Sequence, residues 1–299
     1  MVEIRPATSD ADLTAWREVY MAVVPNEIAA TVEQMRSSSR AQQMRLLAEV
    51  DGRVVGSGVV GPSDFPDAMF LMPRVPPAFR RRGYGTALLR ALLAHAAALD
   101  GRDVAVGHVD DPGSLAFAER FGFREFDRQV EQVRAVGPAD AADVAVPDGV
   151  RIVSVGQRPD LWPVAYEAIG KQAFEDMALV TPITVTLEQW EQTWISDPEA
   201  MFVALAGDEV VGSAGLILDS DQPRRAENAL TVVRRDWRGR GVARALKLIT
   251  LAWAAGHDIT EVYTWTQRGN DDMRALNERL GYVYRSESIN VRAPLPVEV

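Results

Sequence analysis

The chain has 299 residues and no cysteine, which excludes disulfides, thiolate metal sites and a cysteine nucleophile. Long hydrophobic runs are missing too. The most apolar stretch, ALLRALLAHAAALD at 87–100, contains an arginine and a histidine and is too short to span a bilayer. The start, MVEIRPATSD, is charged within five residues and has no apolar core of a secretory signal. These absences predict a soluble, cytoplasmic protein with no membrane partner.

Basic residues are outnumbered by acidic ones, 32 against 42, and the net charge is -10. This balance argues against a general nucleic-acid binder, which needs a broad basic face, but leaves room for a local pocket for a small anion. Lysine is scarce, because Lys171 and Lys247 are the only two. In such a chain a cluster of arginines can belong to an ordinary solvated surface. Only its position in the fold can indicate a binding site. The three histidines show no metal-ligand spacing, and no metal site is predicted.

Three segments of the sequence each occur twice, in similar form and in the same order. DGRVVGSGVV at 51–60 returns as GDEVVGSAGL at 207–216, and VPPAFRRRGYGTALL at 75–89 returns as VRRDWRGRGVARAL at 233–246. AFAERFGFRE also returns as ALNERLGYVY, near the end of each copy. Three matches in one order, at nearly constant spacing, indicate two copies of one domain.

The segment between the copies is rich in Ala, Asp, Pro and Gly and is typical of a linker. We therefore predict an N-terminal domain at 1–136, a linker at 137–149 and a C-terminal domain at 150–299. Each domain has an ordinary length for an independent core.

The second copy has clear secondary-structure signals. Gly207–Asp208 separates two apolar strands as a hairpin turn, and ENALTVV at 227–233 is typical of a further strand. A helix is expected from about Gly241, with Ala243, Leu246, Ile249 and Trp253 on its apolar face. The strand EVYTWT, the helix NDDMRALNERLG and the strand YVYRSESINV follow. This order predicts an α+β fold, in which each domain has a mixed, mostly antiparallel sheet flanked by helices.

An arginine-rich and glycine-rich loop connects the strand ending at Val233 to that helix. The first N–H groups of a helix have no internal partner, and the helix dipole favours negative charge there. Glycines allow the main chain to approach an anion closely, and arginines bind phosphate through paired donors. The loop is therefore predicted to bind a diphosphate.

Two other nucleotide motifs do not fit. A Walker loop requires Gly-Lys-Ser/Thr, and no lysine lies in either loop. The dinucleotide motif requires a third glycine, which both loops lack. It also follows the first strand of its domain, whereas these loops come late in each copy.

The loops resemble those of the GNAT superfamily of acyl-CoA-dependent N-acyltransferases, in which Arg/Gln-x-x-Gly-x-Gly/Ala holds the pyrophosphate. The matching stretches are RRRGYG at 80–85 and RGRGVA at 238–243. The family's short helix ending in Gly-Phe/Tyr resembles NDDMRALNERLGY closely and DPGSLAFAERFGF loosely. The resemblance covers nearly the whole chain in two tandem domains.

The resemblance implies acetyl-CoA as cofactor, held by the loop and by the strand before it, which splays from the next strand. The implied cofactor-binding residues of the second copy are Thr231, Val232, Val233, Arg238, Gly239, Arg240, Gly241, Val242, Ala243 and Asn270. Those of the first copy are Val75, Arg80, Arg81, Arg82, Gly83, Tyr84, Gly85 and Thr86. Asn270 also precedes two acids and is a good helix N-cap, and these two roles can coexist.

The resemblance further implies an acetyl transfer to the primary amine of a small molecule, by direct attack in a ternary complex. Glu227 occupies the strand position where the family often has its general base, and the corresponding residue of the first copy is Met69. The C-terminal domain is therefore predicted to be catalytic and the N-terminal one to be degenerate or structural. A solvated acid at a strand entrance is the alternative for Glu227. Glu175 and Asp176 could attract a cationic amine or belong to a solvated loop.

One position departs from the family pattern. The tyrosine that often protonates the leaving thiolate is replaced by Asn277 in the second copy and by Ala118 in the first. Tyr263, Tyr282, Tyr284 or water could substitute for it, although tyrosines in strands more often pack in the core. Two alternatives stay open: an acyl-CoA-binding protein without turnover, and catalysis by the N-terminal domain. The acceptor and the oligomeric state do not follow from the sequence.

Overall fold

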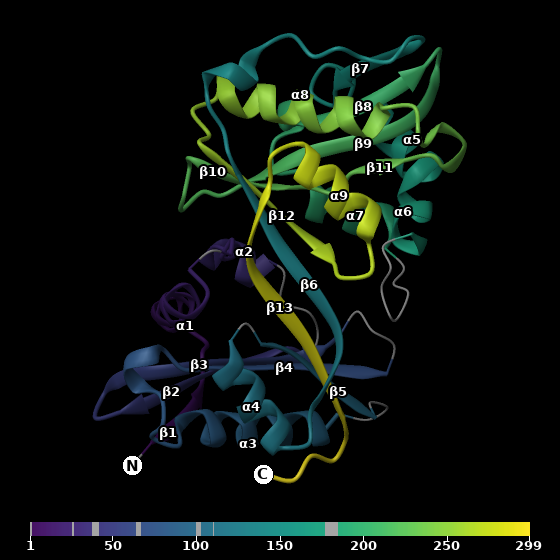
Figure 1. The fold of residues 1–299 in the computed structure, drawn as a ribbon. Coiled ribbons are helices and arrows are strands. Elements are labelled where there is room, and N and C mark those ends of the chain that lie inside the picture. Colours follow the sequence, from purple (N-terminus) through teal and green to yellow (C-terminus); the bar gives the residue numbers. More distant parts are fainter. Residues whose placement is uncertain are drawn as a thin grey trace. The chain divides into compact units, whose positions relative to one another are not determined.

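The computed structural model describes residues 2–25, 27–37, 42–63, 67–99, 103–109, 111–176 and 185–299. The chain forms two compact units (Figure 1). The first unit comprises Met1–Phe126 with Ser288–Val299, and the second comprises Asp127–Glu287. Among the described residues, no helix is both long enough and apolar enough to cross a membrane.

The sheet of the first unit has the strand order β1-β2-β3-β4-β5-β13. All neighbouring strands are antiparallel except β4 and β5, which are parallel. Its strands are β1 (Glu3–Pro6), β2 (Met44–Val50), β3 (Arg53–Pro62), β4 (Ala68–Arg74), β5 (Val104–Val109) and β13 (Val283–Pro294).

The α-helices that the described part of this unit contains are α1 (Asp10–Val23), α2 (Val32–Ser37), α3 (Tyr84–Ala97) and α4 (Pro112–Arg120). A 3-10 turn, η1 (Pro77–Phe79), precedes α3. Helix α3 lies so close to β3 that a Cβ atom on Gly58 would come within 3.1 Å of Leu92. The glycine therefore permits the tight packing of α3 on the sheet.

The sheet of the second unit has the order β6-β12-β10-β9-β8-β7, with β11 paired to β9 beyond the end of β10. Among the pairings of the described strands, that of β10 with β12 is parallel and the others are antiparallel. Its strands are β6 (Arg124–Ala135), β7 (Val150–Ser154), β8 (Met201–Ala206), β9 (Glu209–Leu218), β10 (Arg225–Asn228), β11 (Val232–Val233) and β12 (Glu261–Gln267).

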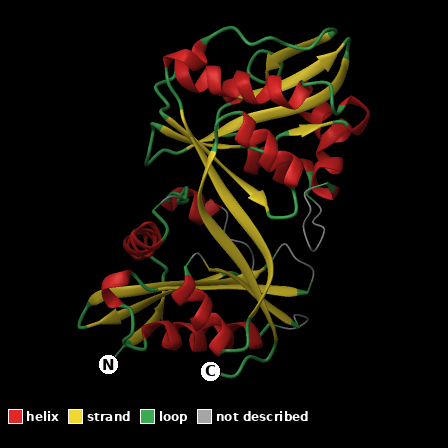
Figure 2. Cartoon of the chain, in the orientation of Figure 1, coloured by secondary structure: helices red, strands yellow, loops and turns green. Residues whose placement is uncertain are grey.

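Helices cover both faces of this sheet. Along β8, Met201, Val203 and Leu205 belong to one apolar cluster and Phe202 and Ala204 to another, as the two-residue period of a strand requires. The first cluster contains α5 (Leu161–Ala165), η3 (Tyr166–Gly170), α6 (Lys171–Glu175) and α7 (Leu187–Trp194). The second contains the start of α8 (Val242–Gly256), which runs alongside β8 and β9 in Figure 2. Helix α9 (Asp271–Arg279) and the turns η2 (Pro138–Ala141), η4 (Pro198–Ala200) and η5 (Arg235–Trp237) complete the unit.

The last strand of each sequence copy completes the sheet of the other unit. Strand β6 begins in the first copy, and its residues Gln129–Ala135 pair with β12 in the second unit. Strand β13 ends the second copy, and its residues Ile289–Pro294 pair with β5 in the first unit. We call this arrangement the strand exchange. The α+β fold with mostly antiparallel sheets is confirmed, and the boundaries 1–136, 137–149 and 150–299 stay a prediction drawn from the repeat.

Candidate functional site

The predicted diphosphate loop of the second unit lies between β11 and α8, where the sequence expected it. After η5 the chain adopts positive φ angles at Gly239 (74°) and Gly241 (83°), a backbone region that favours glycine. Helix α8 then starts at Val242. The N–H groups of the first helical turn therefore point out of the end of α8, as an anion site requires.

The corresponding loop of the first unit has the same backbone. Its positive φ angles are at Arg81 (64°) and Gly83 (84°), and α3 starts at Tyr84. The guanidinium Nε of Arg80 donates to the carbonyl of Val75 at 3.1 Å. In the second unit, Nε of Arg238 donates to the carbonyl of Val233, also at 3.1 Å. The first arginine of each loop thus ties the loop to the end of the preceding strand.

The two loops differ in their charged neighbours. Asp176 binds both Arg235 and Arg238 through its two carboxylate oxygens. Burial opposes ionisation of Asp176, but the hydrogen bonds from the two arginines lower the pKa of its carboxyl. Glu175 also lies within 3.1 Å of Arg235. Both acids considered for the acceptor therefore lie at the arginine loop.

Among the described residues, fewer carboxylates pair with the arginines of the first unit's loop than with those of the second unit's loop. Arg80 lies 3.4 Å from Asp111, the N-cap of α4. In the part of the chain that the structure describes, no carboxylate pairs with Arg81 or Arg82. In the second unit the guanidinium carbon of Arg240 lies 4.6 Å from the ring centroid of Trp237.

Strands β10 and β12 of the second unit pair over only part of their length. Their parallel pairing ends at Glu227 and Tyr263, whereas the pairing of β12 with β6 continues to Gln267. Within the described strands, Val232 and Val233 pair with β9 and not with β12. The strand predicted at 227–233 is thus interrupted at 229–231, and its second part has left β12.

Glu227 lies at the point where the two strands separate. Its Oε2 accepts a hydrogen bond from the hydroxyl of Tyr263 at 3.1 Å. Burial first, and then the charge of Glu227, raises the pKa of Tyr263 above its ordinary value. In the first unit the equivalent residue is Met69, which is fully buried opposite Ala105. Of these two strands, only that of the second unit offers a carboxylate here.

The two asparagines of the α9 region make structural contacts. Asn270 caps the helix, since its Oδ1 accepts from the backbone N–H of Met273 at 3.3 Å. Asn277, at the position of the family tyrosine, is fully buried and donates from Nδ2 to Gln132 of β6 at 2.9 Å. Ala118 is also buried in the first unit. Asn277 therefore ties α9 to the exchanged strand and cannot donate a proton as a phenol does.

The acetyltransferase (GNAT) family model matches residues 10–123 and again residues 166–282. The chain belongs to this family. It is an acyltransferase of the N-acetyltransferase type, and the two matches confirm the tandem arrangement of GNAT domains.

Relatives agree with this assignment, and solved structures share the fold. The mycothiol acetyltransferase of Nocardia farcinica is 28% identical over 245 residues, which are 79% of this chain and 78% of the relative. That of Streptomyces bingchenggensis is 26% identical over 277 residues, 87% of each chain. A tandem GNAT protein from the clavulanic acid biosynthesis pathway has a similar fold, with a TM-score of 0.76, 21% identity and 98% of both chains covered. A GCN5-related N-acetyltransferase from Sphaerobacter thermophilus gives a TM-score of 0.71 at 20% identity, covering 98% of this chain and 95% of that one.

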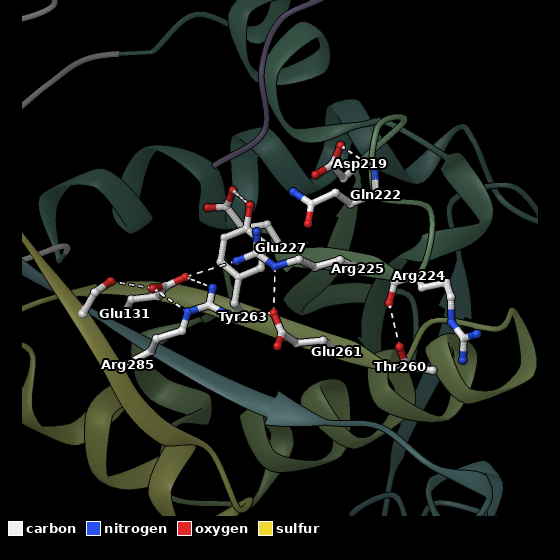
Figure 3. Close-up of polar contacts among 11 residues, drawn as sticks. Glu131, Asp219, Gln222, Arg224, Arg225, Glu227, Thr260, Glu261, Tyr263 and Arg285 are labelled. Atoms are coloured by element: carbon white, nitrogen blue, oxygen red, sulfur yellow. Dashed lines mark hydrogen bonds and ion pairs between the residues drawn. The ribbon is translucent and has the colours of Figure 1, made fainter. Parts of the chain in front are cut away.

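An ionic cluster around the buried side chains of Glu131 and Arg225 was missed by the sequence analysis. Glu131 of β6 contacts Arg225 of β10 and Arg285 of β13, and both arginines contact Glu261 of β12 (Figure 3). Burial opposes ionisation of Glu261, but hydrogen bonds from Arg285 and Arg225 lower the pKa of its carboxyl. The only sequence signal was a charged residue in each of four strands, and such residues usually face solvent.

Proposed function

We propose that this GNAT protein transfers the acetyl group of acetyl-CoA to the primary amine of a small molecule in its second unit. The amine nitrogen attacks the thioester carbonyl carbon directly in a ternary complex, a C–N bond forms and the C–S bond breaks. Glu227 accepts the proton that the amine loses. The departing thiolate takes a proton from water, and the proton on Glu227 then neutralises the hydroxide that this leaves. The products are the N-acetylated amine and free CoA, and the proton count balances.

The position of Glu227 carries this proposal. A general base needs a carboxylate within reach of the reacting amine, and Glu227 stands where β10 and β12 separate. Met69 at the equivalent place in the first unit cannot accept a proton. The relatives named mycothiol acetyltransferase support a small-molecule acceptor.

Acetyl-CoA is proposed to bind both arginine loops. In the second unit the diphosphate lies at the start of α8, and the pantetheine arm pairs with the strand edge that has left β12. Its proposed contacts are Thr231, Val232, Val233, Arg238, Gly239, Arg240, Gly241, Val242, Ala243 and Asn270. Those of the first unit are Val75, Arg80, Arg81, Arg82, Gly83, Tyr84, Gly85 and Thr86.

Glu227→Gln is expected to lower kcat about hundredfold while the KM for acetyl-CoA stays unchanged, because the amide cannot take the proton. Release of free CoA with a panel of primary amines measures the rate. Glu278→Gln, an exposed change on α9, is the matched control. Full activity of Glu227→Gln would remove this residue from the mechanism.

Isothermal titration with CoA is expected to find two sites per chain. Arg238→Glu should abolish one site together with turnover, because it places a negative charge at the catalytic diphosphate. Arg80→Glu should abolish the other site and leave turnover intact. A single site in the wild-type protein, or loss of turnover in Arg80→Glu alone, would contradict the assignment of the two loops.

A further inference from the structure

A chain of side-chain contacts leads from the exchanged strand β6 to Glu227 (Figure 3). Oε1 of Glu131 accepts from Nη2 of Arg225 at 3.2 Å. The guanidinium carbon of Arg225 lies 3.9 Å from the ring centroid of Tyr263, at the separation of a close cation–π contact. The hydroxyl of Tyr263 then donates to Oε2 of Glu227. Two side chains therefore connect a fully buried carboxylate with the proposed base.

Arg225 has little freedom in this arrangement. It is 6% exposed, and its Nε also donates to Oε1 of Glu261 at 2.7 Å. Glu131 is itself held by Arg285, whose Nε donates to Oε2 at 2.8 Å, and by the hydroxyl of Ser286 at 2.5 Å. Because several directed contacts fix the guanidinium plane, the ring of Tyr263 rests against a rigid surface.

The phenol of Tyr263 is a hydrogen-bond donor at every pH where the enzyme would work. Burial and then the charge of Glu227 raise its pKa, so the proton stays on the phenol. A donor on a carboxylate stabilises the charged form of that carboxylate. Among the described residues, the other charged groups around this phenol and its support are Arg225, Asp219, Glu131, Glu261 and Arg285.

We propose that Tyr263 is a positioning residue for the general base, and that Arg225 and Glu131 hold Tyr263 in place. This inference rests on the proposed function, because it assumes that Glu227 accepts the proton. Glu131 belongs to the first sequence copy and reaches the second unit through the strand exchange. The first copy therefore supplies part of the support of the second unit's active site.

Tyr263→Phe tests the proposal, because it removes only the hydroxyl and keeps the ring under Arg225. We expect kcat to fall about tenfold, the cost of one hydrogen bond to a charged group, with an unchanged KM for acetyl-CoA. We also expect the acidic limb of the kcat–pH profile to move about one unit to higher pH, since the carboxylate loses a donor. Tyr166→Phe is the matched control, because its buried hydroxyl donates to the carbonyl of Val185 in the same unit.

Glu131→Gln tests the support. It keeps a hydrogen-bond acceptor beside Arg225 but removes a negative charge, so Arg225 is less neutralised and the acidic limb should move to lower pH, opposite to the shift in Tyr263→Phe. The weaker hold on Arg225 should also lower kcat, by less than in Tyr263→Phe. A wild-type pH profile in Tyr263→Phe overturns the positioning role, and a wild-type profile in folded Glu131→Gln overturns the role of β6. If Glu227→Gln is fully active, the proposed function fails instead, so the two failures can be told apart.

Discussion

Glu131→Ala is expected to lower the free energy of unfolding by about 3–5 kcal/mol. The carboxylate is fully buried and accepts hydrogen bonds from Arg225, Arg285 and Ser286. Its removal would take from the guanidinium of Arg225, which is itself buried, a fully buried carboxylate, whereas the carboxylate of Glu261, which Arg225 keeps, is partly exposed. Urea unfolding followed by circular dichroism at neutral pH measures the loss.

Glu287→Ala is the matched control for this prediction. Glu287 pairs with Arg128 in the same two strands, but its side chain is 50% exposed. Exposed ion pairs contribute about 0–1 kcal/mol, so this variant should unfold almost like the wild type. A loss in Glu131→Ala that is no larger than the loss in Glu287→Ala would show that the buried cluster does not hold β6 in the second unit.

Lys247→Met is expected to raise the free energy of unfolding by about 3 kcal/mol at pH 7. Burial lowers the pKa of Lys247 from 10.5 to about 7, because the ammonium form is poorly solvated inside the unit. This shift amounts to about 5 kcal/mol at pH 7 and below, and the lost hydrogen bond to Asn228 offsets about 1–2 kcal/mol of the gain. Asn228 keeps the hydrogen bond from the hydroxyl of Tyr282 at 2.8 Å.

The stability gain of Lys247→Met is expected to depend on pH. Between about pH 7 and 10.5 the unfolded chain holds a proton on Lys247 that the folded chain has lost, so the stability of the wild type rises with pH in this window. The advantage of Lys247→Met should therefore be largest at pH 7 and below, and should shrink towards pH 10.5. Lys171→Met is the control, because the other lysine is exposed and pairs with Glu167. An advantage that stays constant across this pH range would refute the lowered pKa.

The arginine loops were predictable because each of their features is local in sequence. The positive φ angles fall at Gly239 and Gly241, and the helix begins directly after them. The duplication strengthened the prediction, since Gly83 showed the same pattern in the first copy. Interruption of the strand at 229–231 left no local signal, because the sequence there is as apolar as that of an unbroken strand.

Helix α8 shows where periodicity alone was insufficient. Of the face predicted from Ala243, Leu246, Ile249 and Trp253, only Leu246 is fully buried and the others are half-buried. The buried face is shifted and includes Lys247 and Thr250, with the lysine amine bonded to Asn228 of β10. A lysine in a helix is ordinarily solvated, so its burial depends on a partner from a distant strand.

The contacts proposed to hold Glu227 in place could not be predicted. Their residues, Tyr263, Arg225 and Glu131, come together only through pairing between distant segments. Glu131 and Arg225 are 94 residues apart, and β6 reaches β12 only because the last strands are exchanged. Sequence comparison of the two copies would instead have assigned each strand to its own domain. Tyr263 was considered, but as a possible acid and more readily as a core residue.

The strand exchange also has a consequence for how such a gene can evolve. A half-length chain ending in the linker would carry β6 without β12 and would leave the outer edge of β5 uncovered. Open strand edges invite aggregation, so fission into two separate genes would be selected against. After duplication, each copy would be retained as an obligatory partner in the folding of the other, whatever happens to its own chemistry.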